Sequence, residues 1–192
     1  MRVSLAAETN MAKRSQIPQM QGSPDDFQTP RKAVAPLLPY LHKEWRIWEC
    51  AAGKGNLVRA LRGQGYEIHG SDILDGNNFL TTPAPLPFDC IVTNPPYSLK
   101  DEFVGRCYDY GKPFALLMPL TALEGERKQQ LYREHGIQLI IPNQRINFET
   151  PSGVDFGSWF TTAWFTWRLS LPRDLNFFDL KHSNDLEQLA LL

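Results

Sequence analysis

Short apolar segments rich in β-branched and aromatic residues alternate along this chain with segments of helical spacing. Strands are predicted over 46–50, 66–70, 88–93, 113–118 and 137–141, and helices over 55–63, 99–110 and 122–135. Because helices connect most of these strands, consecutive strands run in the same direction, and the helices cover both faces of the sheet. The alternation therefore predicts an α/β domain built on a mostly parallel sheet.

The segments on either side of this alternation give further expectations. Residues 1–24 are rich in Gln, Ser, Lys and Pro without periodicity, so we expect a disordered or flexible arm. A helix irregular at its prolines is predicted over 29–42, capped by Thr29. Residues 159–169 alternate as one long final strand, which closes a domain over 25–171. Residues 172–192 then form a tail that can carry a short helix at 184–191.

Composition narrows the class of protein. With 42% hydrophobic residues and no apolar run long enough to span a bilayer, the chain reads as a globular protein without membrane contact. No signal-peptide core is present, so we expect a cytoplasmic location. The formal net charge of -1 is unlike that of a strongly basic nucleic-acid binder. Contacts to phosphate would depend on local cations: Lys100, Arg127, Lys128 and Arg145.

The metal-binding residue types show no site pattern. The three cysteines lack the paired spacing of metal ligands and are expected to be buried free thiols: Cys50, Cys90 and Cys107. The four histidines are scattered through the sequence and are expected to be structural or surface residues: His42, His69, His135 and His182. We therefore predict no metal site.

The tetrapeptide Asn94-Pro95-Pro96-Tyr97 directly follows a predicted buried strand. A side-chain amide, two prolines that fix the backbone and an aromatic ring can offer two acceptors to an exocyclic amine and a face for the base that carries it. Such a device positions a planar NH2 group. Since Asn-Pro often opens turns and Pro-Pro stiffens loops, the tetrapeptide alone fits a structural turn equally well.

A glycine-bearing turn, Ala51-Ala52-Gly53-Lys54-Gly55-Asn56, joins the first predicted strand to its helix. Gly53 and Gly55 would let the backbone pass close to a ligand beside the free N–H groups of the helix start. The third glycine of the dinucleotide fingerprint and a Gly-Lys-Ser/Thr sequence are both missing, so a nucleoside cofactor without phosphates fits better. Ordinary packing turns also use glycine at this position.

Residues after the second predicted strand can complete a nucleoside site. Asp72, about twenty residues beyond the glycine turn, can bind both hydroxyls of a ribose, although an Asp here can also simply cap the next turn. In the loop that follows, Asn78 can accept from an adenine amine. Phe79 can donate its backbone N–H or pack on the ring.

Together these motifs resemble the S-adenosylmethionine-dependent amino-methyltransferases, especially the DNA adenine N6-methyltransferases. The ordered set is Glu49-x-Ala51-x-Gly53-x-Gly55, Asp72, Asn78-Phe79-Leu80 and Asn94-Pro95-Pro96-Tyr97. Asp26-Phe27-Gln28-Thr29-Pro30 resembles the segment that, in small phage-encoded members, closes over the methionine part of the cofactor. Arg145-Ile146-Asn147-Phe148 resembles the segment before the final hairpin that contributes to the target-base pocket. The resemblance covers roughly residues 25–170.

The resemblance implies a Rossmann-like class I methyltransferase fold: a mostly parallel seven-stranded sheet with one antiparallel strand, the final one, hairpinned to 137–141. It implies S-adenosyl-L-methionine as cofactor, DNA as partner, and a bacterial or phage setting such as restriction–modification or restriction evasion. The oligomeric state, monomer or homodimer, stays open. The residues implied to bind the cofactor are Phe27, Thr29, Pro30, Glu49, Ala51, Gly53, Gly55, Asp72, Ile73, Asn78, Phe79 and Asn94.

The resemblance also implies the catalytic and substrate-binding residues. Asn94 and Pro95 would accept the two N6 protons of adenine through the side-chain oxygen and the backbone carbonyl. Tyr97 would stack on the base, and Phe148 would lie on its other side or edge. Since a paired base cannot reach such a pocket, the nucleotide must be flipped or single-stranded. The substrate-binding residues are Pro96, Tyr97, Lys100, Arg145, Asn147 and Phe148.

The chain departs from the family pattern in informative ways. Glu49 and Asn78 stand where many relatives have Asp, which we expect to change cofactor affinity rather than chemistry. Sequence-specific relatives carry a separate target-recognition domain, and residues 149–158 leave no room for one, so we expect low sequence specificity. The alternatives are an RNA adenine or protein glutamine methyltransferase and a non-catalytic nucleic-acid-binding module. Residues 26–30 speak against the protein-directed group, and the intact tetrapeptide speaks against the module.

Overall fold

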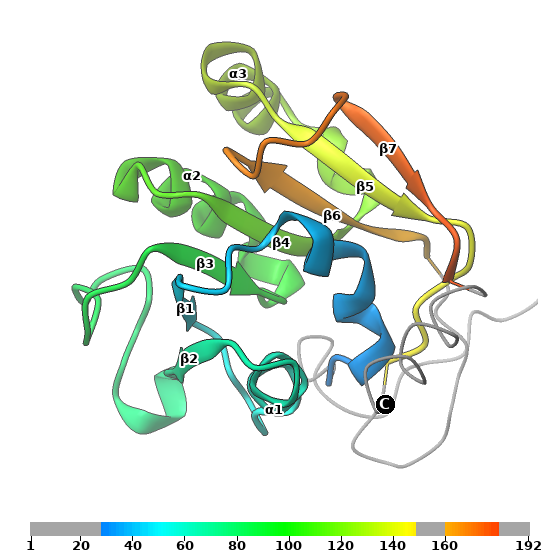
Figure 1. Cartoon of the computed structure of the whole chain (residues 1–192). Helices are drawn as coiled ribbons and strands as arrows, with labels where there is room; N and C mark the ends of the chain where they lie inside the picture. The colour runs from blue at the N-terminus through cyan, green and yellow to red at the C-terminus, as the bar shows by residue number, and fades with distance from the viewer. Residues whose placement is uncertain (1–27, 149–159, 181–192) are drawn as a thin grey trace, which may run out of the picture.

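The computed structural model describes residues 28–148 and 160–180 and has a single seven-stranded sheet at its centre (Figure 1). The strand order is β2-β1-β3-β4-β6-β5-β7. The strands are β1 (Arg46–Glu49), β2 (Glu67–Gly70), β3 (Cys90–Thr93), β4 (Phe114–Pro119), β5 (Gln138–Pro142), β6 (Thr162–Trp167) and β7 (Leu175–Phe178).

Strand directions follow the expected mixed pattern. The pairs β1–β2, β1–β3, β3–β4 and β5–β7 are parallel. Strand β6 lies between β4 and β5 and runs antiparallel to both. The predicted seven-stranded, mostly parallel sheet with one antiparallel strand hairpinned to β5 is confirmed.

Successive side chains along the strands point alternately into two hydrophobic cores, one on each face of the sheet. Ile47 and Trp164 face one core, whereas the adjacent Trp48 and Phe165 face the other. Strands buried on both faces are typical of parallel sheets covered by helices, and β4 is buried along its whole length. The helices lie on both sides of the sheet (Figure 1).

The first face is covered by η1 (Arg31–Tyr40) and α1 (Asn56–Gly63). The element predicted over 29–42 is a 3-10 helix preceded by Pro30, so the expected Thr29 cap is wrong. Pro36 and Pro39 lie inside it, and because proline has no N–H and clashes with the preceding turn, a regular α-helix cannot form there. The indole of Trp164 donates to the Ala33 carbonyl at 2.7 Å, which fixes η1 on the sheet.

The second face is covered by α2 (Lys100–Tyr110) and α3 (Glu126–His135). The helix predicted over 122–135 is wrong in its first turn: η4 (Leu120–Leu123) and the residues up to Gly125 precede α3. The expectation for Lys128 is wrong too, since its side chain is 4% exposed and its ammonium forms an ion pair with Asp101 of α2. Lys128 therefore joins α2 to α3 and is not a surface cation for phosphate.

Strand β7 lies in the segment that sequence patterns assigned to the tail. It pairs in parallel with β5, and Asn176 donates to the Leu139 carbonyl at 3.1 Å. Strand β6 is shorter than the predicted 159–169, because the backbone of Arg168 and Ser170 has φ values of 56° and 57° and turns out of the strand. The predicted arm at 1–24 and tail helix at 184–191 lie outside the described residues.

Candidate functional site

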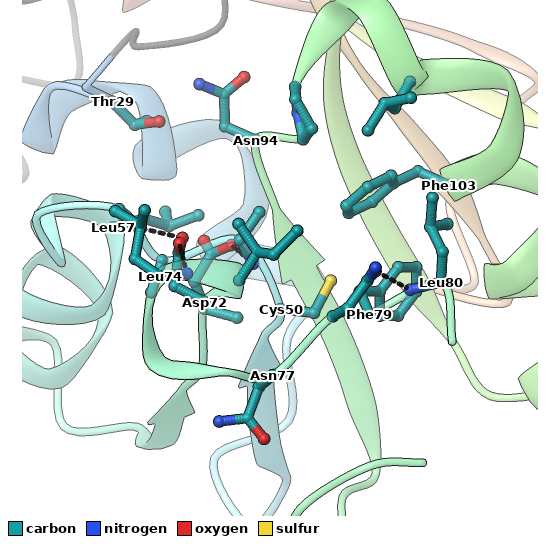
Figure 2. A pocket seen from close by; sticks show the side chains of 18 of the residues that line it. Thr29, Cys50, Leu57, Asp72, Leu74, Asn77, Phe79, Leu80, Asn94 and Phe103 are labelled. Atoms are coloured by element: carbon teal, nitrogen blue, oxygen red, sulfur yellow. Dashed lines mark hydrogen bonds between the residues drawn. The ribbon is translucent and has the colours of Figure 1, made fainter. Parts of the chain in front are cut away.

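The carboxyl ends of β1 and β3 and the loop after β2 surround a cavity of about 460 Å³ (Figure 2). A cavity at this edge of a parallel sheet is where α/β folds bind ligands. In Figure 2, Asp72 and Leu74 lie on one wall and Phe79 and Phe103 on the other, with Cys50 between them. One wall therefore carries a carboxylate beside an apolar side chain, and the other is aromatic.

The glycine turn passes under the cavity in a conformation that favours glycine. Gly53 has φ +50°, and Gly55 has φ +76° as the residue that caps α1. A Cβ on Gly53 would lie 3.1 Å from the side-chain nitrogen of Gln28. Gln28 is buried and its side-chain oxygen accepts from the Lys54 N–H at 3.2 Å. The segment at 28–30 is thereby attached to the glycine turn.

Asp72 joins the end of β2 to the same turn. One carboxylate oxygen accepts from the Gly53 N–H at 2.8 Å, and the other accepts from the Leu74 N–H at 3.0 Å. A carboxylate can accept about four hydrogen bonds, so both oxygens keep acceptor capacity toward the cavity. Asp72 is thus placed to hold the turn and to bind ligand hydroxyls with the same group.

Glu49, the last residue of β1, is 1% exposed and lines the cavity from below the turn. Its side-chain oxygen accepts from the Ala51 N–H at 3.2 Å and from the Thr93 hydroxyl. Burial raises the pKa of Glu49 to about 8, and the hydrogen bonds from Thr93 and Ala51 oppose that rise. At neutral pH the carboxyl is therefore mainly protonated.

The loop after η2 (Ile73–Asp75) supplies the aromatic wall. Asn78 lines the cavity, and its side-chain oxygen accepts from the Leu80 N–H at 3.0 Å, which fixes the loop as a turn. Phe79 stacks on Phe103 of α2 at 4.7 Å between ring centroids. These rings form a flat apolar surface of the kind that suits a nucleobase.

The tetrapeptide begins where β3 ends and turns into η3 (Tyr97–Leu99). Asn94 and Pro96 line the cavity, and Asn94 projects at its edge in Figure 2. Tyr97 does not line this cavity, and its ring lies edge-on to Phe148, at 6.5 Å between ring centroids, and to Phe160, at 5.5 Å. Its hydroxyl is buried, and burial raises its pKa.

The predicted site residues divide into two groups. Ten of them line the cavity: Thr29, Glu49, Ala51, Gly53, Asp72, Ile73, Asn78, Phe79, Asn94 and Pro96. The others do not line it: Pro30, Gly55, Pro95, Tyr97, Lys100, Arg145, Asn147 and Phe148. Phe27 lies outside the described residues. The rings of Tyr97 and Phe148 lie nearly perpendicular to each other.

Sequence patterns missed several cavity residues. Gln28 lies in the motif at 26–30 but was given no role, yet its side chain accepts a hydrogen bond from the glycine turn. Leu99 and Phe103 come from the helical segments after the tetrapeptide, and only the fold brings them to the cavity. Leu74 carried no sequence signal, because its 87% exposure beside the cavity is visible only in the fold.

Two classes of feature are missing from the part of the chain that the structure describes. No group of three His, Cys, Asp or Glu residues there is arranged to hold a metal ion. No helix within residues 28–148 and 160–180 is long and apolar enough to cross a membrane. The three cysteines are buried and free, as predicted.

No protein-family model matches the sequence, and no curated protein matches it. Among solved structures, the fold is similar to a type I restriction–modification methyltransferase subunit from Streptococcus thermophilus, with a TM-score of 0.53 and 19% identity over 82% of this chain and 48% of that one. A structure of a type I restriction–modification system has a TM-score of 0.52 and 16% identity over 81% of this chain and 45% of that one.

This chain therefore spans about half the length of those structures. Together with the strand order and the antiparallel β6, the likeness shows that the chain has a Rossmann-like class I methyltransferase fold.

Proposed function

We propose that the chain is an S-adenosylmethionine-dependent methyltransferase that acts on the exocyclic N6 of adenine in DNA with low sequence specificity. One observation carries the proposal: Asn94 of the tetrapeptide opens onto the same cavity as Gly53 and Asp72. The proposed amine acceptor and the proposed nucleoside site would therefore be contiguous. When bound, the cofactor would supply a methyl group made electrophilic by its sulfonium.

The cavity has the size and lining that a nucleoside cofactor needs. Its volume of about 460 Å³ lies within the roughly 300–1,000 Å³ typical of cofactor pockets. Asp72 keeps acceptor capacity for ribose hydroxyls, and Phe79 and Phe103 offer an apolar wall to the adenine ring. Glu49 and Gln28 lie at the turn, where a cationic methionine part would be held.

The chemistry of an aromatic amine explains the tetrapeptide. The lone pair of adenine N6 is delocalised into the ring, so the amine is a poor nucleophile. The Asn94 side-chain oxygen and the Pro95 carbonyl would each accept one N6 proton, which favours a pyramidal nitrogen and stabilises its developing positive charge. The Asn94 amide is no base at neutral pH, so it orients the amine, and the proton leaves to water. In-line placement supplies much of the remaining acceleration.

DNA is the partner that the tetrapeptide and the fold favour. The two similar structures belong to type I restriction–modification systems. A flipped or single-stranded adenine would pack against Tyr97, whose ring already contacts Phe148 and Phe160 edge-on, and base–aromatic stacking offsets unstacking by about 1–3 kcal/mol. Arg145 and Arg127 are exposed cations, and Lys100, which donates to the Tyr97 carbonyl at 3.2 Å, lies at the tetrapeptide.

The experiment is incubation with S-adenosylmethionine that carries a labelled methyl group. Duplex DNA, single-stranded DNA, RNA and a mixed protein substrate are offered in parallel, and the nucleosides and amino acids are analysed by mass spectrometry after digestion. We expect labelled N6-methyladenine from DNA. Label confined to RNA or protein would assign the site to another planar amine or amide, and binding of the cofactor without transfer to any substrate would indicate a non-catalytic module.

A further inference from the structure

The buried carboxyl group of Glu49 accepts hydrogen bonds from two parts of the proposed site, the glycine turn and the end of β3. Glu49 accepts from the Ala51 N–H in the glycine turn and from the hydroxyl of Thr93 at the end of β3. Thr93 is 0% exposed and immediately precedes Asn94. The chain thus places a single ionisable group between the turn that would hold the cofactor and the residue that would hold the amine.

Few groups are placed to set the charge of this carboxyl. Asp72, from the loop after β2, is the charged group that acts on it, and its negative charge raises the pKa of Glu49 further. Strand β3 presents the uncharged Thr93 hydroxyl, and the neighbouring Cys50 is a buried thiol whose pKa is raised well above its usual range. Among the described residues, no cation contributes to the shifted pKa of Glu49. Its charge state therefore depends on what enters the cavity.

A cationic ligand would change the Thr93 hydrogen bond. Glu49 lines the cavity, so a positive charge there favours the carboxylate over the neutral acid. Hydrogen bonds to an ionised acceptor are shorter and roughly twice as strong as those between neutral groups. The Thr93 hydroxyl would then be held more firmly, and with it the backbone that leads into Asn94.

We propose that Thr93 is a positioning residue through which the cationic methyl donor, acting on Glu49, orders the Asn94 loop before the amine binds. The inference rests on the proposed function and deepens it. Occupancy by the donor improves binding of adenine at Asn94, whereas the demethylated product, which lacks the sulfonium charge, does so less. By linkage, bound DNA in turn favours the charged donor over the product. The site thereby distinguishes reactant from product.

The test compares how two adenosyl ligands change the affinity of the whole chain for an oligonucleotide. Affinity for a single-stranded, adenine-containing oligonucleotide is measured by fluorescence anisotropy at pH 7, with saturating sinefungin, a cationic analogue that transfers no methyl group, or with S-adenosylhomocysteine. We expect wild type to bind the oligonucleotide about fivefold more tightly with sinefungin. Thr93→Val removes the hydroxyl and should reduce this ratio to about one, while Thr93→Ser keeps the hydroxyl and should restore it.

A second measurement reports Glu49 directly. Calorimetry of S-adenosylmethionine binding in buffers of different ionisation enthalpy should show proton release at pH 7 from wild type and none from Glu49→Gln. The inference is overturned if Thr93→Val keeps the wild-type ratio of the two oligonucleotide affinities. It is also overturned if wild type binds the oligonucleotide equally tightly with both ligands while it still methylates DNA. Failure of both adenosyl ligands to bind would remove the proposed function itself, and the inference with it. Thermal unfolding of each variant establishes that it is folded.

Discussion

The carboxylate of Asp72 accepts a hydrogen bond from the Gly53 amide at 2.8 Å, which joins the end of β2 to the turn that follows β1. Removing the side chain would release the turn and leave a backbone N–H without its acceptor. We expect Asp72→Ala to weaken S-adenosylmethionine binding by at least tenfold in calorimetry. Asp72→Asn keeps one acceptor oxygen and should lose less. Unchanged affinity in Asp72→Ala would remove both roles of this residue.

Gly53 adopts a left-handed conformation with the Gln28 side chain above it. Gly53→Ala would add backbone strain of about 1–2 kcal/mol and press on Gln28. We expect weaker cofactor binding and lower stability. Gly63 is the matched control, because it ends the helix α1 and a Cβ there would meet nothing within 4 Å. Gly63→Ala should leave cofactor affinity unchanged, and equal losses in the two variants would refute the assignment to Gly53.

The buried Glu49 carboxyl makes stability depend on pH. Its pKa is about 8 in the folded protein and near 4.5 in the unfolded chain, so between these values the folded state holds a proton that the unfolded state has lost. Raising the pH therefore lowers the free energy of unfolding, by up to about 1.4 kcal/mol per pH unit. Urea unfolding from pH 5 to 8 should show this decline in wild type and a smaller one in Glu49→Gln. If the free energy of unfolding declined equally with pH in wild type and in Glu49→Gln, the assignment of the pH dependence to Glu49 would be contradicted.

The ion pair of Lys128 with Asp101 contributes to stability, whereas its neighbour Arg127 is exposed. The Asp101 side chain is 35% exposed, so Lys128→Ala should cost ~1–3 kcal/mol, less than the loss of a fully buried pair. Arg127→Ala should change stability by about 0.5 kcal/mol or less. Chemical unfolding of both variants checks this, and equal stability losses would show that burial of Lys128 is immaterial.

The alternation of strands and helices predicted the architecture because buried parallel strands leave a strong apolar signal. Strand β7 was not predicted because the apolar Leu175 and Phe177 are exposed on an edge strand, whereas the buried position between them is the polar Asn176, so the segment lacks the usual apolar pattern of a half-buried strand. The helix expected at 29–42 follows its apolar spacing, but the missing N–H groups of Pro36 and Pro39 decided its type. Lys128 looked like a surface cation because an ion pair between two helices depends on their packing.

The candidate site was predictable to the extent that it follows strand ends. Gly53, Asp72 and Asn94 each follow a strand, and parallel strands bring such positions to one edge. Gln28 and Phe103 reach the cavity from elsewhere in the sequence, and only tertiary packing places them. The link from Glu49 to Thr93 also joins residues distant in sequence, on strands whose adjacency the sequence pattern does not specify.

Asn94 is the residue on which the account depends most. It lines the same cavity as the glycine turn and is proposed to orient the amine without holding that turn in place. The measurement is mass spectrometry of DNA nucleosides after incubation with methyl-labelled S-adenosylmethionine, for wild type and Asn94→Ala, together with calorimetry of cofactor binding. The account predicts N6-methyladenine from wild type, none from Asn94→Ala, and cofactor affinity within about threefold of wild type in the variant. N6-methyladenine formed by Asn94→Ala at the wild-type rate would contradict it.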